Sequence, residues 1–583
     1  MAREICFDNA LNVLKYGYLL IFAVQVGIVY SYNIETNPKK VGKAQGEKNS
    51  KFGYTVAIVR KPGWINGDKS FLDKELLVGA PNLTYNNIIG HGQVARCMTP
   101  TSENITCISL NLEDPSNLCA KLKKNETDCA FESRLGATIE VNRNYFKNTG
   151  ADMVTVCAPG WKNVYPERAP DKYQNYMPGM CLRMRDELKV QPCGTRLCWP
   201  FFSSSNTTTF RGRPQYTYAE GGMSATYTKD GFGDIIGAPG ADDWRGAFKS
   251  YKKHWTARLS FDYTTNTMYF GYALTVAKFW NGEMVISGAP NWNDPTKMGH
   301  HYGKVYLYNG NNQEFALEFG FPSAPCPDQD NLDLRELIDK EQTGTKFGAA
   351  LAAVDVTGDG YDELFVGAPF YTGDNPEEGR VFVYSSDTGT SICGPIGILS
   401  GGVNVPSLKG KSSFARFGAA IASMGDLDLD GYNEVAIGAP YEDNGTGAIY
   451  IYPGIGECKC GMKDHFTQRI AGRDLDIGLR SFGWSMYGDE DIDDNSFPDF
   501  AVGAYASDTA LVFRARPIVN VDVEIEMTPN PIPLTGSLLP CSTETLCFNV
   551  KVKFRFDSVG RRKLKVDNIY LNWTLYSDTL HKS

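Results

Sequence analysis

The sequence repeats one pattern seven times, and this repeat constrains the fold more than any other feature. Each copy opens with an aromatic or apolar residue and glycine, and continues through a small or apolar strand and a polar turn. It closes with an apolar strand that ends in Gly-Ala-Pro or a near variant, and a third strand follows most copies. The copies span residues 52–81, 134–159, 221–239, 269–290, 346–369, 416–440 and 481–505.

The length of the repeat indicates a β-propeller. The last three copies open at Phe347, Phe417 and Phe482, which are 70 and 65 residues apart, enough for about four short strands each. One such unit alone would bury too little apolar surface, whereas seven can close into a ring without free edges. Glycine permits tight turns and close backbone approach where strands crowd near the axis. We therefore predict an all-β protein with a seven-bladed β-propeller over residues 32–518.

The pattern changes after residues 514–517. Residues 519–525, 548–556 and much of 569–575 alternate between apolar and polar side chains. This period of two is typical of half-buried strands. An immunoglobulin-like sandwich has about seven strands, and only about three fit here. We predict that residues 519–583 form part of such a sandwich.

The N-terminus has the layout of a secretory signal peptide. Arg3 and Lys15 precede an apolar stretch at 16–29, and the small residue Ser31 follows it. A membrane anchor is the alternative, but the stretch is short for a span of about 20 residues and contains Gln25. We predict that residues 1–31 are removed and that the chain is extracellular.

The cysteines fit an oxidising compartment, because 14 of the 15 remain after the signal peptide and most form local pairs. A zinc site is the alternative, but no histidine accompanies these pairs at ligand spacing. The partners of Cys326, Cys393, Cys458 and Cys460 stay open. The predicted disulfides are Cys97–Cys107, Cys119–Cys129, Cys157–Cys181, Cys193–Cys198 and Cys541–Cys547.

Sequons for N-glycosylation support a secreted glycoprotein. They lie at Asn82, Asn104, Asn125, Asn206, Asn444 and Asn572.

Three acidic turns occupy the same place in the last three copies, before the Gly-Ala-Pro strand. Oxygen ligands at loop positions 1, 3, 5 and 9, with a main-chain carbonyl at position 7, surround a hard cation, and several carboxylates favour Ca²⁺ over Mg²⁺. An EF-hand would need Glu at position 12, where this chain has Val366, Ile437 and Val502. We predict three structural Ca²⁺ sites. Their ligands are Asp355, Thr357, Asp359, Tyr361, Glu363, Asp426, Asp428, Asp430, Tyr432, Glu434, Asp491, Asp493, Asn495, Phe497 and Asp499.

Two positions depart from the usual loop. Thr357 replaces a carboxylate or amide at position 3, and Ser496 replaces glycine at position 6. A single acidic turn is more often a solvated turn, but three copies at one repeat position favour metal. Such sites stiffen hairpins rather than catalyse reactions.

Charge and histidine content exclude two classes of function. The net charge of −9 leaves no basic surface that would neutralise nucleic-acid phosphates. The chain has six histidines, none at the spacing of a catalytic triad or a zinc site. We predict no enzyme, no catalytic residue and no small-molecule substrate.

The Phe-Gly/Gly-Ala-Pro repeats with Asp-x-Asp-x-Asp-Gly loops resemble those of integrin α subunits. Residues 32–35 are similar to the family's mature N-terminus, and residues 514–517 and 541–550 resemble the start of its thigh domain. The 62 residues from Pro159 to Gly221 are too few for the von Willebrand-type domain that some members insert there. The resemblance implies a cell-adhesion receptor that pairs with an integrin β subunit and binds an extracellular-matrix protein.

The resemblance also implies where these partners bind. In the family, the β subunit docks on aromatic residues around the central opening, for which Tyr54, Tyr272 and Trp484 are candidates; simple packing of inner strands is the alternative. Matrix ligand would bind loops of the first blades, where Trp244 and Tyr251 stand beside a basic stretch. This patch favours a laminin-type ligand over Arg-Gly-Asp, with a solvated basic loop as the alternative.

The family places this region at the extracellular face of the plasma membrane, within the integrin complex. The remaining thigh, the calf domains and the membrane helix of the family are not found in this sequence. A soluble truncated isoform that binds a β subunit or matrix without signalling is therefore the alternative expectation, and such a chain would be secreted.

Overall fold

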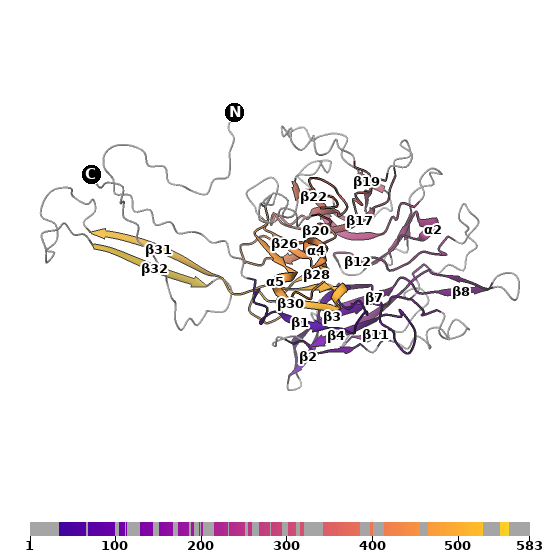
Figure 1. Cartoon of the computed structure of the whole chain (residues 1–583), viewed down its shortest axis with the longest axis horizontal. Coiled ribbons are helices and arrows are strands. Elements are labelled where there is room, and N and C mark those ends of the chain that lie inside the picture. Colours follow the sequence, from indigo (N-terminus) through magenta and orange to yellow (C-terminus); the bar gives the residue numbers. More distant parts are fainter. Residues whose placement is uncertain are drawn as a thin grey trace, which may run out of the picture. The chain divides into compact units, whose positions relative to one another are not determined.

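Seven antiparallel four-stranded sheets make up the main part of the protein in the computed structural model (Figure 1). The structure describes residues 34–558 with internal gaps, the longest at 113–128, 202–214, 320–341, 400–412 and 529–548. The predicted signal peptide and residues 559–583 lie outside the described residues.

In blades one to six the four strands follow one another across the sheet in chain order. Blades one to three are β2 (Thr55–Ile65), β3 (Asp68–Ala80), β4 (Gln93–Met98) and β5 (Cys107–Ser109); β6 (Thr138–Asn142), β7 (Met153–Ala158), β10 (Met180–Arg185) and β11 (Lys189–Val190); and β12 (Ala225–Tyr227), β13 (Asp234–Ala238), β14 (Ala247–Ser250) and β15 (Trp255–Arg258). Blades four to six are β16 (Ala273–Phe279), β17 (Gly282–Ala289), β18 (Lys304–Asn309) and β19 (Phe315–Phe319); β20 (Ala350–Val354), β21 (Glu363–Ala368), β22 (Arg380–Tyr384) and β23 (Gly397–Leu399); and β24 (Ala420–Gly425), β25 (Glu434–Ala439), β26 (Ala448–Tyr452) and β27 (Gln468–Ala471).

The seventh blade is completed by the N-terminal part of the chain. Its strands β28 (Phe482–Glu490), β29 (Asp499–Ala504) and β30 (Thr509–Phe513) are joined by β1 (Gly42–Gln45), which pairs antiparallel with β30. The first strands β2, β6, β12, β16, β20, β24 and β28 contact one another in sequence, and β28 contacts β2. The ring is therefore closed, and the predicted seven-bladed propeller is confirmed.

Close backbone contact at the blade junctions explains the Gly-Ala-Pro glycine. The carbonyl oxygen of the glycine that opens the next blade approaches so closely that it would lie 2.0–2.2 Å from any Cβ at this position. A side chain cannot fit at that distance. Glycine meets this requirement in six blades, whereas Cys157 takes the equivalent place in blade two. The six are Gly79, Gly237, Gly288, Gly367, Gly438 and Gly503.

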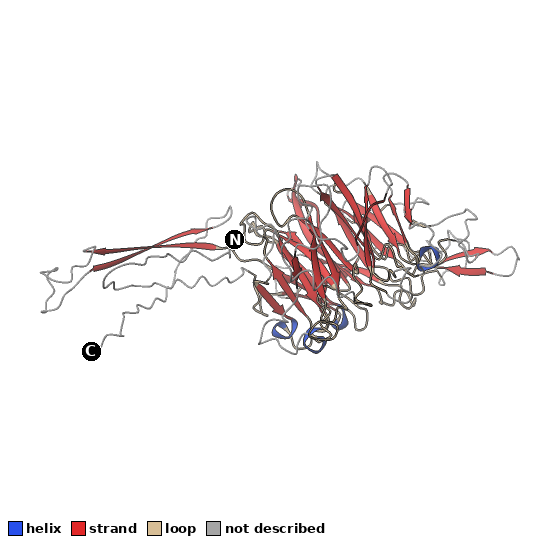
Figure 2. Cartoon of the chain, turned by 90° about the horizontal axis from the view of Figure 1, so that it is seen from above, coloured by secondary structure: helices blue, strands red, loops and turns tan. Residues whose placement is uncertain are grey.

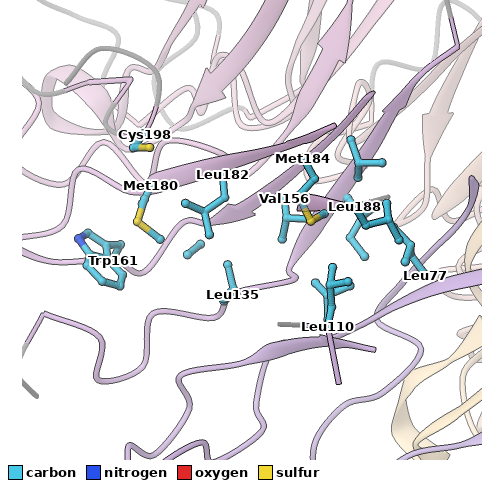
Figure 3. Packing of buried hydrophobic residues seen from close by; sticks show 14 of the residues in the cluster. Leu77, Leu110, Leu135, Val156, Trp161, Met180, Leu182, Met184, Leu188 and Cys198 are labelled. Carbon is cyan, nitrogen blue, oxygen red and sulfur yellow. The ribbon is translucent and has the colours of Figure 1, made fainter. Parts of the chain in front are cut away.

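The core consists of apolar residues packed between neighbouring blades. Figure 3 shows the cluster between blades one and two, in which Met180, Leu182 and Met184 project from one face of β10 beside Val156 of β7. Leu77 joins them from β3 of blade one. Because each blade buries both faces against its neighbours, a single blade has no stable core of its own.

Helix is confined to short turns in the described residues, and strands dominate the ring (Figure 2). These turns are α2 (Ala241–Trp244), α4 (Glu442–Gly445), α5 (Gly472–Leu475) and the 3₁₀ turn η3 (Tyr505–Ser507).

Two hairpins form two-stranded sheets of their own. In blade two, β8 (Asn163–Pro166) pairs with β9 (Tyr173–Tyr176). In the predicted second domain, β31 (Val519–Thr528) pairs with β32 (Asn549–Ser558). These strands match two of the three alternating segments, whereas the third lies outside the described residues. The immunoglobulin-like sandwich remains a prediction.

We expect Gly438→Ala to lower the free energy of unfolding by about 2 kcal/mol or more, because the new Cβ would meet the Gly483 carbonyl oxygen 2.0 Å away. Denaturant unfolding measures this change. The control is Gly478→Ala, whose nearest neighbour would be a side-chain oxygen at 3.2 Å. Equal unfolding of the two variants would contradict the packing explanation.

Candidate functional site

Three acidic loops join the first and second strands of blades five, six and seven. In each loop the aspartate at position 1 accepts two backbone N–H groups from further along the loop. Asp355 accepts from Gly358 (2.8 Å) and Gly360 (2.9 Å). Asp426 accepts from Asp430 (3.0 Å) and Gly431 (2.9 Å), and Asp491 accepts from Asn495 (3.0 Å) and Ser496 (2.7 Å). These bonds curl each loop around one point.

The position-5 side chain fixes the residue that would supply the main-chain carbonyl. Asp359, Asp430 and Asn495 each accept the N–H of the position-7 residue: Tyr361 (2.8 Å), Tyr432 (2.9 Å) and Phe497 (2.7 Å). Position 7 is therefore held in a defined orientation in all three loops.

A buried carboxylate closes each loop at position 9. Glu363, Glu434 and Asp499 are at most 1% exposed, and each accepts the backbone N–H of loop position 2. The three bonds measure 3.1, 2.6 and 2.7 Å. Each carboxylate thus uses one oxygen to hold the loop backbone, and the other oxygen of Asp499 accepts the Ala515 N–H (2.8 Å).

The loops of blades six and seven bring three carboxylates together. Ligand oxygens of Asp426, Asp428 and Glu434 all lie within 4.8 Å of one another, as do those of Asp491, Asp493 and Asp499. The second oxygen of Glu434 is buried and has no protein hydrogen-bond partner. A bound cation would satisfy this oxygen, so the residues present fit a hard divalent ion.

The charges of these carboxylates are poorly tolerated without a cation. Burial, together with nearby aspartates, raises the pKa of Glu434 to about 9 and the pKa values of Asp499 and Glu363 to about 8. Burial and Asp430 raise the pKa of Asp428 to about 6. A cation that replaces these protons would remove the repulsion.

The blade-five loop is the weaker candidate. Among the described residues it does not bring three carboxylates within the same distance, because Thr357 stands at position 3. Position 6 keeps the expected turn in all loops: φ is 86° at Gly360, 100° at Gly431 and 81° at Ser496. The serine substitution therefore leaves the backbone unchanged. The binding of Ca²⁺ at the predicted ligands stays a prediction.

Aromatic side chains gather at the N-terminal ends of the first strands, opposite the acidic loops. Trp484 lies 5.6 Å from Tyr54 and 4.7 Å from Tyr505 between ring centroids. Tyr441 lies 6.4 Å from Trp484, and its hydroxyl is 3.2 Å from that of Tyr505. We call Tyr54, Tyr441, Trp484 and Tyr505 the aromatic cluster. Tyr272, the third predicted docking residue, is 36% exposed.

Sequence reasoning found two members of this cluster and missed two. Tyr54 and Trp484 follow the opening glycines, where we looked. Tyr441 and Tyr505 follow the ends of the second strands, which return to the same face in an antiparallel sheet. The available signal was the residue that follows Gly-Ala-Pro in blade six and the residue that replaces its proline in blade seven.

The predicted ligand-binding residues of blade three divide between described and undescribed parts. Trp244 stacks on Tyr218 with ring centroids 5.7 Å apart and an interplanar angle of 9°. Tyr251 lies outside the described residues.

Two of the predicted cysteine pairs, Cys97–Cys107 and Cys157–Cys181, are joined by disulfides. Cys129 and Cys198 are also disulfide-bonded, and their predicted partners lie outside the described residues. So do Cys541, Cys547 and the four cysteines whose pairing was left open.

Three of the predicted glycosylation sites are described, and all three are exposed: Asn82, Asn104 and Asn444. The other three, Asn125, Asn206 and Asn572, lie outside the described residues.

The ring and its loops define a seven-bladed β-propeller with acidic loops in three neighbouring blades. The family model "FG-GAP repeat" matches residues 347–384 and 417–452, in blades five and six. The chain is 28% identical to integrin alpha-4 of Xenopus laevis, 29% to integrin alpha-V of Gallus gallus and 29% to integrin alpha-3 of Cricetulus griseus. These matches cover 93%, 83% and 96% of this chain and 47%, 43% and 48% of the relatives.

The predicted resemblance to integrin α subunits is therefore confirmed over most of the chain. The chain spans about half the length of these relatives. Among the described residues, no helix has the length and hydropathy that a membrane crossing requires.

The raised pKa values predict how pH affects the calcium-free protein. Glu434, Glu363 and Asp499 stay protonated in the folded state up to about pH 8–9, whereas an unfolded glutamate loses its proton near 4.5. The folded state then binds more protons, so the free energy of unfolding should fall as the pH rises from 5 to 9. Saturating calcium should reduce this fall, whereas the share from buried acids outside the loops, such as Glu140 with its pKa raised to about 8 by burial, should remain. Thermal melts with and without calcium test it, and identical pH profiles would contradict it.

We expect Glu434→Gln to fold but to lose much of the stabilisation by calcium. Glutamine keeps an acceptor for the Leu427 N–H, but it removes a carboxylate from the cluster. Calcium should raise the melting temperature of this variant by several degrees less than that of wild type. Asp374→Asn, at an exposed position outside the loops, is the control.

Proposed function

We propose that this chain is the propeller-bearing part of an integrin-type α subunit, a cell-adhesion receptor that pairs with a β subunit. The observation that carries the proposal is the aromatic cluster at one end of a propeller whose sequence resembles integrin α subunits. Each first strand begins at this end and runs to its turn at the other, so partner docking and cation binding would use opposite faces.

The residues around the cluster have the composition of a protein interface. Arg416 lies over the rings of Phe370 (4.3 Å) and Tyr441 (4.8 Å), and Glu377 holds its guanidinium at 3.0 Å. Tyrosine, tryptophan and arginine are the residues most enriched among those that dominate binding energy. A rigid aromatic surface of this kind supports docking of a folded partner.

The residue before the two-residue opening of each repeat (Phe-Gly or its variant) supports docking at the same face. The residue has a positive φ in all seven blades, which turns its side chain away from the strand that follows. The seven residues are Lys51, Arg134, Glu220, Tyr269, Lys346, Arg416 and Ser481. Four of the seven are cationic, so a polar rim would surround the aromatic cluster, as is usual at interfaces.

We propose that the loops of blades five to seven bind Ca²⁺, and that a matrix protein binds near the stacked Tyr218–Trp244 pair of blade three. The sequence after Trp244 offers no acidic side chain to receive the arginine of Arg-Gly-Asp, which favours a laminin-type ligand. The protein would then act at the extracellular face of the plasma membrane.

Co-expression with an integrin β-subunit ectodomain in calcium tests the pairing. We expect a one-to-one complex by size exclusion with light scattering. Trp484→Ala should weaken that complex at least about ten-fold, because it removes the central ring of the cluster. Met98→Ala, at the end of β4 and 60% exposed in the native chain, is the control, because it lies outside both the aromatic cluster and the acidic loops. A stable monomer with every β subunit offered would contradict the proposal.

A further inference from the structure

At four of the seven blade junctions, a side-chain hydroxyl at one shared position of the repeat bonds to the next blade. Each stands two residues after the opening glycine of its blade and donates to the carbonyl of the equivalent glycine in the next blade. The four bonds are Thr55 Oγ1 to Gly136 O (2.8 Å), Thr138 Oγ1 to Gly222 O (2.7 Å), Ser224 Oγ to Gly271 O (2.8 Å) and Ser485 Oγ to Gly53 O (3.1 Å). We call them the junction hydroxyls; they link blade seven to one, one to two, two to three and three to four.

The other three junctions have alanine at this position. Ala273, Ala350 and Ala420 stand at the junctions of blades four and five, five and six, and six and seven. The acceptor carbonyl is in the same place at these junctions. The carbonyl oxygen of the next blade's opening glycine would lie 2.0, 2.2 and 2.0 Å from a Cβ on Gly288, Gly367 and Gly438. The corresponding distance is 2.0 Å at Gly79, beside Thr55. The carbonyl is therefore presented, but the alanine has no hydroxyl to donate.

At the opposite end of the ring, the acidic loops of blades five, six and seven reach these same junctions. We call them the cation loops. At the junction of blades four and five, Lys278 donates its backbone N–H to Asp362 (2.5 Å) and its ammonium group to the Gly360 carbonyl (2.8 Å). At the junction of blades five and six, the Asn433 side chain of one loop donates to the Asp355 carbonyl of the other (2.7 Å).

The junction of blades six and seven has a close contact in the corresponding place. A Cβ on Gly425, which precedes the blade-six loop, would lie 2.5 Å from an Asp489 carboxylate oxygen, which precedes the blade-seven loop. Each junction that lacks a junction hydroxyl thus meets a cation loop or its flank. These loops hold carboxylates close together, and a bound cation would neutralise their charge. The order of the loops, and the contacts that they make at the junctions, would therefore depend on that cation.

We propose that the propeller has two kinds of blade junction. Those from blade one through two and three to four are fixed by hydroxyls and are independent of metal. The junction of blades seven and one has both a hydroxyl and a contact from Lys74 of β3 to Asp494 of the blade-seven loop (2.7 Å). Those from blade four through five and six to seven depend on the cation loops. Removal of calcium therefore loosens the ring first on the side of blades five and six, which have no junction hydroxyl at either boundary.

Hydrogen exchange of the full chain, with calcium and after chelation, tests the order of opening. We expect chelation to speed amide exchange in β20 and β24 at least about ten-fold and to leave β6 and β12 nearly unchanged, because local opening sets the exchange rate. Equal acceleration around the ring, or earlier loss in blades two and three, would overturn the proposal. No β subunit is involved, so the result is independent of the proposed pairing.

An added hydroxyl separates the junction effect from local loss of the ion. Ala420→Ser would place a donor at the Gly483 carbonyl, and it should slow exchange of β24 and β28 in chelator about five-fold. The matched control is Ala419→Ser, one residue earlier, which points to the other side of the strand. If Ala420→Ser exchanges like its control, the junctions do not depend on a missing hydroxyl and the proposal fails.

Removal of a hydroxyl gives the converse test. Thr138→Val keeps the shape of the side chain but cannot donate to the Gly222 carbonyl. We expect faster exchange of β6 and β12 by about the same factor with calcium and in chelator. An effect that calcium suppresses would overturn the division into two kinds of junction.

Discussion

The approach of backbone to backbone at the blade junctions governs the rest of this structure. A carbonyl oxygen that would stand 2.0–2.2 Å from a Cβ leaves no alternative to glycine in six of the seven blades. The glycine fixes where each second strand ends, and the antiparallel pairing then fixes where each first strand turns. One short-range contact therefore assigns the aromatic cluster to one end of the ring and the acidic loops to the other.

The acidic loops show a second constraint, which is the cost of buried charge. The carboxylate at position 9 is needed to hold the N–H of position 2, but its burial raises its pKa to about 8 in blade five and about 9 in blade six. A loop shaped in this way is preorganised for a cation and is unfavourable when its carboxylates are ionised without one. Binding of a cation would consequently be linked to folding stability in these blades.

The sequence predicted the parts of this fold that repeat. The blade number and the places of the three acidic loops follow from the period. That Ser496 keeps the turn of position 6 is known only from the structure. The seventh blade's outer strand could not be predicted, because Gly42–Gln45 carries no repeat and its partner β30 is remote in sequence. The left-handed position 4 of the loops was also missed, since Leu429 and Asp494 adopt it without the glycine that usually signals it.

The two ends of the ring influence each other through the strands rather than by direct contact. A first strand such as β20 has five residues, and at about 3.3 Å per residue it separates the aromatic end from the loop by roughly 17 Å. A cation at the loop is therefore too far from the aromatic cluster to touch a docked partner. Its effect on docking must pass through the order of the first strands, which blades five and six maintain without junction hydroxyls. Tyr441 follows the second strand of blade six, so the proposed docking surface would contain one residue from the part of the ring that we propose depends most on its loops.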